Sequence, residues 1–260
     1  EEKHRRPLYC LDKAFWFPIE NFINLTVYSN HLQKEIKLKT FLRLPDKSKH
    51  PEFKGLVYLF HGMGAHSNTL SQVAYDFADE GFIVASYNYR GHYQSEGETI
   101  KDFQEVTDDT QQFIKQTDQY IKENYGEKVS QNKFMWGSSM GGLVCFEVTK
   151  NNNFDCKGAL FVVPGFSIID NIGSLSEEDF SKLGTKNPEY FDQKSQFKDS
   201  CSLEGVIAVF LQMPKSFSEL HTYNTPFQLN IAGIDKVVNP LSQYALYEKA
   251  KTQDKEVHFY

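Results

Sequence analysis

The sequence predicts an α/β fold in which a mainly parallel sheet carries helices on both faces. Runs rich in apolar residues at 55–60, 82–86, 159–163 and 226–231 are typical of buried strands. Amphipathic helical stretches separate these runs, and strands that alternate with helices in this way form a parallel sheet. Because the sequence of 260 residues contains no internal repeat, we expect a single domain.

Two antiparallel strands are expected to lead into this sheet. Residues 1–20 show no regular period and are rich in aromatic side chains near their end. Apolar and polar residues then alternate over 22–28 and 35–44, which is typical of half-buried strands. Ser29-Asn30-His31 supplies the turn between them, and a polar loop leads on to the first buried run.

Helices are predicted where apolar residues recur at a spacing of three or four. One such stripe runs from Leu70 to Ala78, and Gly81 stops that helix. A longer amphipathic helix is expected over 102–124. Asn239-Pro240 combines an N-cap residue with a favourable first residue for another helix, and the last predicted strand covers 256–260.

The interval 165–222 breaks the alternation of strands and helices. Ser174-x-x-Glu177 is a capping-box pattern that opens one helix, and 203–211 is apolar enough for another, with Pro214 after its end. We interpret the interval as a helical cap inserted over the strand ends. The alternative is a helical excursion that packs on the domain.

The composition excludes several classes of protein. The net charge is −6 and no block of Lys or Arg stands out, so no nucleic-acid partner is expected. Cys10, Cys145, Cys156 and Cys201 are scattered without a C-x-x-C pair, which predicts buried free thiols and no metal or disulfide framework. No run approaches the ~18 apolar residues of a membrane span. No signal peptide is visible either, and we favour the cytoplasm or an organelle interior over secretion.

Both ends of the sequence read as cut. Glu1 stands in place of an initiator Met, and Tyr260 falls inside the last predicted strand, so we expect a truncated carboxyl end. Asn24-Leu25-Thr26 is an N-x-T acceptor, which would be glycosylated only in a secretory context.

The pattern G-x-S-x-G occurs at residues 137–141, between a short apolar run and a second one that suits a helix. In that context the pattern is typical of a nucleophile elbow, a sharp strand-to-helix turn that exposes a serine. Ser139 is therefore the candidate nucleophile. The alternative is a serine in an ordinary glycine-rich turn.

Acyl transfer also needs N–H groups that stabilise the oxyanion. We expect the backbone N–H of Met140, directly after the nucleophile, to be one of them. The other is the N–H of Met63, in the loop that follows the strand at 55–60. His61 and Gly62 precede Met63, and His61 is expected to brace this loop by hydrogen bonds rather than to act as a base.

Asp235 follows a predicted strand at the sheet edge where catalytic groups gather, which makes it the candidate acid. Capping of a loop is the alternative role. The chain order in this fold is nucleophile, acid and then histidine. After Asp235 the only histidine is His258, inside the last predicted strand, so the general base is expected beyond Tyr260. Other histidines have no spacing that marks them as substitutes: His66, His92 and His221.

Four ordered segments resemble the monoacylglycerol lipase group of α/β-hydrolases, also called the serine aminopeptidase-like hydrolases. They are His61-Gly62-Met63-Gly64-Ala65-His66-Ser67, Arg90-Gly91-His92-x-x-Ser95-x-Gly97, Gly137-Ser138-Ser139-Met140-Gly141-Gly142 and Ile231-Ala232-Gly233-Ile234-Asp235-Lys236-Val237-Val238. The resemblance covers residues from about Leu56 to Tyr260. Tyr93 stands where the group usually has Gly, and Asn88 where it usually has Asp, and either change could reshape the pocket wall.

The resemblance implies a cofactor-free serine ester hydrolase of lipid metabolism, acting on a monoacylglycerol, a lysophospholipid or a similar acyl ester. The group's cap encloses an apolar tunnel and allows peripheral contact with a membrane. Eight apolar residues could line such a tunnel here, and the alternative is that they form the core of the cap: Phe166, Ile168, Ile169, Val206, Ile207, Val209, Phe210 and Leu211. A second hypothesis, motivated by the missing histidine, is a non-catalytic hydrolase-fold subunit with a structural or binding role in a larger assembly.

Overall fold

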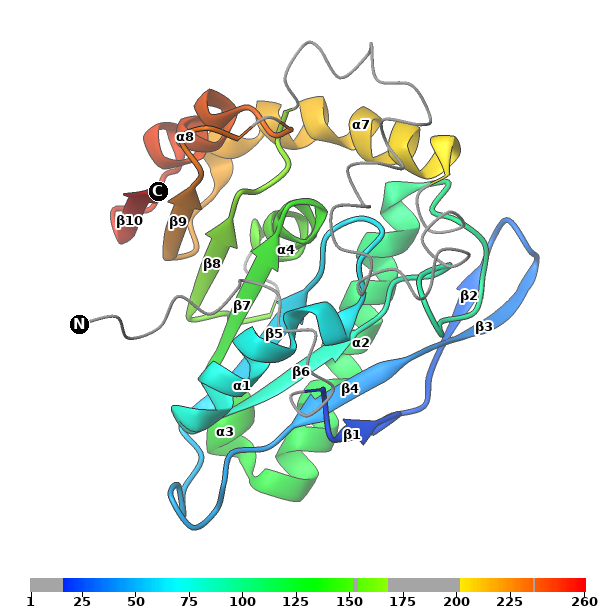
Figure 1. Ribbon diagram of the computed structural model, residues 1–260, viewed down its shortest axis with the longest axis vertical. Coiled ribbons are helices and arrows are strands. Elements are labelled where there is room, and N and C mark those ends of the chain that lie inside the picture. Colours follow the sequence, from blue (N-terminus) through cyan, green and yellow to red (C-terminus); the bar gives the residue numbers. More distant parts are fainter. Residues whose placement is uncertain (1–15, 152–153, 168–201, 236) are drawn as a thin grey trace.

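One eight-stranded sheet forms the centre of the molecule (Figure 1). The computed structural model describes residues 16–151, 154–167, 202–235 and 237–260. In order across the sheet, the strands are β1 (Ile19–Glu20), β4 (Thr40–Arg43), β6 (Phe82–Tyr87), β5 (Gly55–Phe60), β7 (Lys133–Ser138), β8 (Gly158–Val162), β9 (Phe227–Ile231) and β10 (Lys255–Phe259).

In the order across the sheet, β6, β5, β7, β8, β9 and β10 pair in parallel with their neighbours. β4 pairs antiparallel with both β6 and β1. The predicted mainly parallel sheet is therefore confirmed. β5 has all six of its residues buried, as a central strand with helices on both faces requires. β2 (Leu25–Ser29) and β3 (Lys34–Leu38) form a separate antiparallel hairpin beside the sheet.

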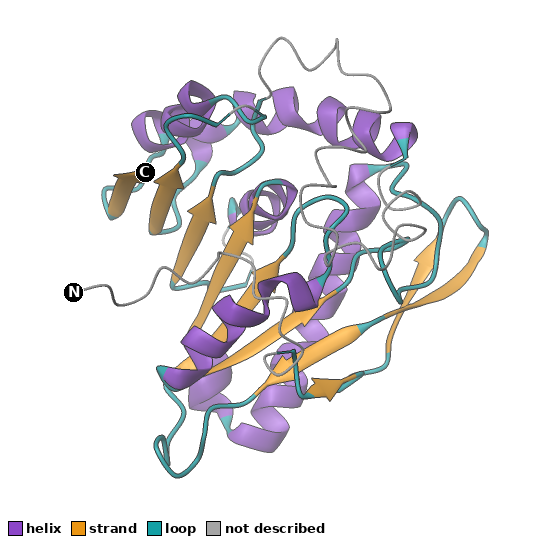
Figure 2. Ribbon diagram, in the orientation of Figure 1, coloured by secondary structure: helices purple, strands orange, loops and turns teal. Residues whose placement is uncertain are grey.

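Helices cover both faces of the sheet (Figure 2). On one face α1 (Ser71–Asp79), preceded by a 3-10 turn at Ser67–Leu70, packs Ala74 and Ala78 against Val57 and Val84. The helices of the larger core on the other face are α2 (Phe103–Tyr125), α3 (Glu127–Gln131), α4 (Met140–Thr149) and α8 (Pro240–Lys249). α7 (Leu203–Ser218), followed by a 3-10 turn at Leu220–Thr222, lies over the carboxyl ends of the strands (Figure 1).

Two sequence predictions are wrong in detail. The predicted strand 35–44 is broken at Lys39 into β3 and β4, which belong to different sheets. The backbone of Lys39 is withdrawn from strand pairing because its N–H donates to Ser95 Oγ, and its carbonyl accepts from the N–H of Asn88. The short helix α3 was not predicted at all.

α7 is longer than its apolar run suggested, because it continues through Pro214 to Ser218. A proline removes one helical hydrogen bond and crowds the preceding turn. Beyond Pro214, the hydroxyl of Ser216 donates to Glu147 of α4, and the Phe217 side chain packs against the larger core. The predicted helix that begins at Ser174 lies outside the described residues.

A buried guanidinium ties the loop after β6 to α2 and to the hairpin. Arg90 is 3% exposed, and its Nε and Nη2 donate to the two carboxylate oxygens of Asp109, each at 2.8 Å. Nη1 forms an ion pair with Glu105, whose other oxygen accepts from the N–H of Asn30 in the hairpin turn. Burial raises the pKa of Asp109 to about 6, against the lowering effect of Arg90.

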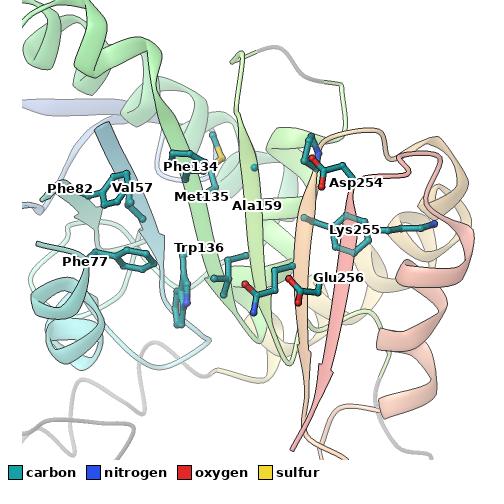
Figure 3. A pocket seen from close by; sticks show the side chains of 15 residues that line it. Val57, Phe77, Phe82, Phe134, Met135, Trp136, Ala159, Asp254, Lys255 and Glu256 are labelled. Atoms are coloured by element: carbon teal, nitrogen blue, oxygen red, sulfur yellow. The ribbon is translucent and has the colours of Figure 1, made fainter. Parts of the chain in front are cut away.

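A second feature of the sheet is a hollow of about 600 Å³ on the face that α1 covers only in part (Figure 3). Its walls include Phe77 of α1, Phe134 and Trp136 of β7, and Leu160 of β8, with Glu256 of β10 at one side.

None of the helices in the described part of the chain is both long and apolar enough to cross a bilayer. Cys145 and Cys156 are buried free thiols as predicted, whereas Cys10 and Cys201 lie outside the described residues.

Replacement of Arg90 by Gln should destabilise the protein strongly. It leaves Glu105 and Asp109 buried without their cation, and breaking a buried ion pair in this way typically costs about 3–5 kcal/mol. Lys49→Gln is the matched control, because it breaks the exposed pair with Asp79, and exposed pairs contribute at most about 1 kcal/mol. Urea unfolding of the variants measures both effects, and equal losses of stability would contradict the structural role of Arg90.

Candidate active site

The predicted strand-to-helix turn is present, with Ser139 between β7 and α4. Ser139 has φ 54° and ψ −121°, a backbone conformation that L-residues rarely adopt. Its N–H donates to the carbonyl of Val162, and its own carbonyl accepts from the N–H of Gly165. The turn is therefore held by β8 and by the loop that follows β8.

The flanking glycines are required by the close approach of backbone segments. A β-carbon on Gly137 would lie 2.2 Å from the carbonyl oxygen of Gly141. A β-carbon on Gly141 would lie 2.0 Å from the carbonyl oxygen of Phe60. Both distances are far inside van der Waals contact, so α4 reaches β7 and β5 only because these side chains are absent.

The loop after β5 lies directly beside the candidate nucleophile. A β-carbon placed on Gly62 would lie 3.9 Å from the Oγ of Ser139. The N–H of Met63 donates to no acceptor within the described residues. Met140 is the first residue of α4, so its N–H has no acceptor within the helix. Two backbone donors are thus available next to Ser139.

Buried histidines support this loop. His61 and His92 are both 0% exposed, and their rings lie 5.4 Å apart. His61 Nδ1 donates to the carbonyl of Gly62 at 2.8 Å, while its Nε2 accepts from the N–H of Tyr89 at 3.4 Å. Burial lowers the pKa of His61 well below its usual value, so the ring is neutral. The expected bracing role of His61 is consistent with these contacts.

His66 and Tyr93 form an aromatic stack next to the same loop. Their rings are 4.4 Å apart and nearly parallel, and Trp16 meets His66 edge-on at 6.4 Å. Tyr93 has φ 47°, in the left-handed region that favours the Gly usual at this position. Asn88 is buried, and its side-chain oxygen accepts from both the N–H and the hydroxyl of Ser67.

Asp235 follows β9 and is partly buried. Its Oδ1 accepts from the N–H groups of Val237 and Val238 at 2.8 and 2.9 Å. No hydrogen bond to its Oδ2 occurs within the described residues. One carboxylate oxygen therefore orients the side chain, which is the capping role, and the other is free to accept a further donor.

No histidine donates to or accepts from Ser139 or Asp235 in the part of the chain that the structure describes. His258 lies within β10 as predicted, and its ring contacts Glu256 on the same strand at 3.0 Å. The described residues also contain no group of three or more His, Cys, Asp or Glu side chains that could hold a metal ion. The structure thus brings the loop that carries Met63 and the first turn of α4 to Ser139, and it places Asp235 after β9, two strands away in the sheet.

Sequence reasoning placed His66 and His92 in loops at strand ends but did not show that His92 is fully buried and His66 partly buried. Burial lowers the pKa of each to about 4, with a smaller contribution from His92 in the case of His66. The signal that could have found them is their position, since both follow buried strands that end at the same sheet edge.

An apolar cavity of about 590 Å³ opens between α7 and the start of α8. Two of its lining residues, Phe166 and Met213, lie beside Gly165, where an added β-carbon would be 3.6 Å from Met213 and 3.5 Å from the carbonyl carbon of Ser139. Its apolar walls are Phe166, Phe210, Met213, Pro214, Phe217 and Leu241. Of the residues expected to line a tunnel, Val206 and Val209 are buried, Ile207 and Leu211 are exposed, and Ile168 and Ile169 lie outside the described residues.

Comparisons with known proteins agree with this geometry. The family model described as "Serine aminopeptidase, S33" matches residues 51–260. The chain is 24% identical to monoglyceride lipase of Homo sapiens over 230 residues, covering 80% of this chain and 74% of that protein. It is 21% identical to monoglyceride lipase of Mus musculus over 232 residues, with the same coverage.

Solved structures share the fold. The monoacylglycerol lipase of Paleococcus ferrophilus superposes with a TM-score of 0.68 at 20% identity, covering 86% of this chain and 88% of that one. A soluble variant of monoglyceride lipase from Saccharomyces cerevisiae, in complex with a substrate analog, gives 0.68 at 16% identity, with coverage of 94% and 89%. A carboxyl esterase from Bacillus coagulans, in complex with glycerol, gives 0.63 at 16% identity, with coverage of 92% and 89%.

The partly buried His66 ring should make the protein less stable in acid. The folded ring has a pKa of about 4, whereas an unfolded histidine binds a proton near pH 6.5. The stability it contributes is therefore complete above about pH 6.5 and is lost as the pH falls toward 4. We expect the difference in unfolding free energy between wild type and His66→Gln to shrink by about 1–2 kcal/mol from pH 7 to pH 5.

Urea unfolding at the two pH values measures this difference. His221→Gln, at an exposed histidine, is the control for the substitution itself. A pH-independent difference for His66→Gln would show that the folded ring is protonated as easily as an unfolded one.

Proposed function

Since the chain belongs to the serine aminopeptidase, S33 family of α/β-hydrolases, we propose that it is a serine ester hydrolase acting through an acyl-enzyme. Its substrate is a monoacylglycerol, a lysophospholipid or a similar acyl ester. The single observation that carries the proposal is the strained Ser139 turn, with the Gly62 loop against the Ser139 side chain. The monoglyceride lipases named above support the substrate class.

In the first step the Oγ of Ser139 attacks the ester carbonyl while a base removes the hydroxyl proton. Negative charge develops on the former carbonyl oxygen. The free N–H groups of Met63 and Met140 are the donors that stabilise it, and removal of one such donor typically costs about 10²–10³ in turnover. Collapse of this intermediate breaks the ester bond, the alcohol leaves with the proton that the base returns, and the acyl group stays on Ser139. The same base then deprotonates a water that attacks the acyl-enzyme, and collapse of the second intermediate releases the acid and returns the proton to Ser139.

The strand order supports a place for one imidazole between Ser139 and Asp235. β8 lies between β7 and β9, so the strands that lead to the two residues are two strand spacings apart, about 10 Å. The free Oδ2 of Asp235 would accept from one ring nitrogen, and the other nitrogen would take the proton of Ser139. No histidine in the described part of the chain bonds to Ser139 or Asp235, so the proposed base is a histidine outside the described residues.

The cavity between α7 and α8 is proposed to receive the acyl chain. It is mostly apolar, lies beside Gly165, and takes most of its lining from the described part of the interval 165–222 and the rest from the start of α8. We therefore interpret that interval as a cap inserted into a single domain. Exposed Ile207 and Leu211 on α7 would give the cap its contact with a lipid surface.

A fluorophosphonate probe tests the nucleophile directly. We expect the full-length protein to be labelled at Ser139, because the elbow exposes this hydroxyl beside two oxyanion donors. Ser139→Ala should abolish labelling and ester hydrolysis, whereas Ser138→Ala, the neighbouring serine of the same turn, should retain both. An unreactive wild-type protein beside a reactive lipase control would overturn the proposal and favour the non-catalytic subunit.

Filling the cavity should change the acyl chain length that the protein accepts. Met213→Trp places a larger side chain in the cavity, so kcat/KM for a long-chain monoacylglycerol should fall at least about tenfold relative to a butyrate ester. Lys215→Trp, on the exposed side of the same helix, is the control of matched size. Equal losses for both chain lengths in Met213→Trp would place the acyl group elsewhere.

A further inference from the structure

We propose that His92 is a positioning residue that fixes the peptide beside the Met63 oxyanion donor, an inference that rests on the proposed function. Its Nε2 accepts from the N–H of Gly64 at 3.3 Å. Its Nδ1 lies 3.0 Å from the carbonyl oxygen of Arg90. The ring thus joins the loop after β5 to the loop after β6.

The two contacts define the protonation state of the ring. Nε2 accepts a hydrogen bond only through its lone pair, so the single ring hydrogen is on Nδ1 and is donated to Arg90. The ring is fully buried, between Tyr89 at 5.7 Å and His61 at 5.4 Å. Turning the ring over would put Cδ2 in the place of Nδ1 and Cε1 in the place of Nε2, and both hydrogen bonds would be lost.

These contacts act on the two planar peptides that flank the Cα of Met63. Each peptide unit is rigid, so holding one atom of the unit orients the rest. His61 holds the first unit through the carbonyl of Gly62, which is bonded to the Met63 nitrogen. His92 holds the second unit through the N–H of Gly64. With both units fixed, the Met63 N–H has one direction.

The loop that carries His92 is itself anchored. Arg90, two residues earlier, is held by Asp109 and Glu105 of α2. The N–H of His92 donates to the carbonyl of Tyr89, and its carbonyl accepts from the N–H of Ser95. The position of the Gly64 peptide therefore depends, through His92 and Arg90, on carboxylates in α2. No contact with substrate is required of His92.

Two variants separate the contacts of the ring. In His92→Asn the side-chain amide can still donate to the Arg90 carbonyl but is too short to reach Gly64. In His92→Gln the longer side chain can present its oxygen to the Gly64 N–H. We expect kcat for a monoacylglycerol to fall about 10- to 100-fold in His92→Asn, with KM changed less than twofold, since an oxyanion donor acts in the transition state. His92→Gln should recover most of the loss.

Hydrogen exchange of the Gly64 amide gives a readout that needs no activity. We expect Gly64 to be protected in the wild type and in His92→Gln, and to exchange faster in His92→Asn. His221→Asn, at the surface, is the control for both measurements. A wild-type protein that hydrolyses esters, with kcat unchanged in His92→Asn, overturns the inference but leaves the proposed function intact.

The opposite failure is also distinguishable. If the wild type does not react, the proposed function fails, while Gly64 exchange still reports whether His92 holds this peptide. Equal losses of kcat in His92→Asn and His92→Gln, with Gly64 protected in both, would assign the effect to general packing and overturn the inference.

Discussion

The absence of room for a β-carbon where α4 meets the sheet is the constraint on which the rest of the site depends. Gly137 and Gly141 allow the helix backbone to lie against the carbonyls of β7 and β5. That approach forces Ser139 into a conformation that costs about 1–3 kcal/mol. The strain persists because Val162 and Gly165 hold both the N–H and the carbonyl of Ser139. The packing of main chain on main chain therefore sets the direction of the Ser139 side chain.

Buried polar contacts fix the loops near Ser139 that have no regular secondary structure. Loops after β5 and β6 carry backbone groups that neither strand nor helix can satisfy. Their partners are side chains: Asn88 for the Ser67 N–H and His92 for the Gly64 N–H. Ser95, in the loop after β6, accepts from the Lys39 N–H between β3 and β4. Arg90 and its two carboxylates fix the segment that holds these partners. A buried polar network of this kind rigidifies a structure when its groups are satisfied.

The strands and most helices could be predicted because local periodicity determines them. β5 and β7 are apolar runs between turn residues, and Asn239 does cap α8 by accepting from the N–H of Leu241. The elements that the sequence did not predict correctly depend on contacts between segments far apart in the chain. Lys39 leaves the strand because it pairs with the loop at 88–95, and α7 continues past Pro214 because Ser216 reaches Glu147.

The same limit applies to the site and to how hollows are interpreted. The hollow of Figure 3 and the cavity beside α7 have nearly equal volumes, about 600 and 590 Å³. Volume therefore does not indicate which of the two hollows binds a ligand. The hollow of Figure 3 is lined by the first residues of β8, β9 and β10, whereas groups that act on ligands in such sheets gather at the carboxyl ends of strands. The cavity beside α7 lies at that end, next to Ser139, and the strained residue and the free donors lie there too. The positions of these groups, rather than size, are why the proposed function assigns the acyl chain to the cavity beside α7.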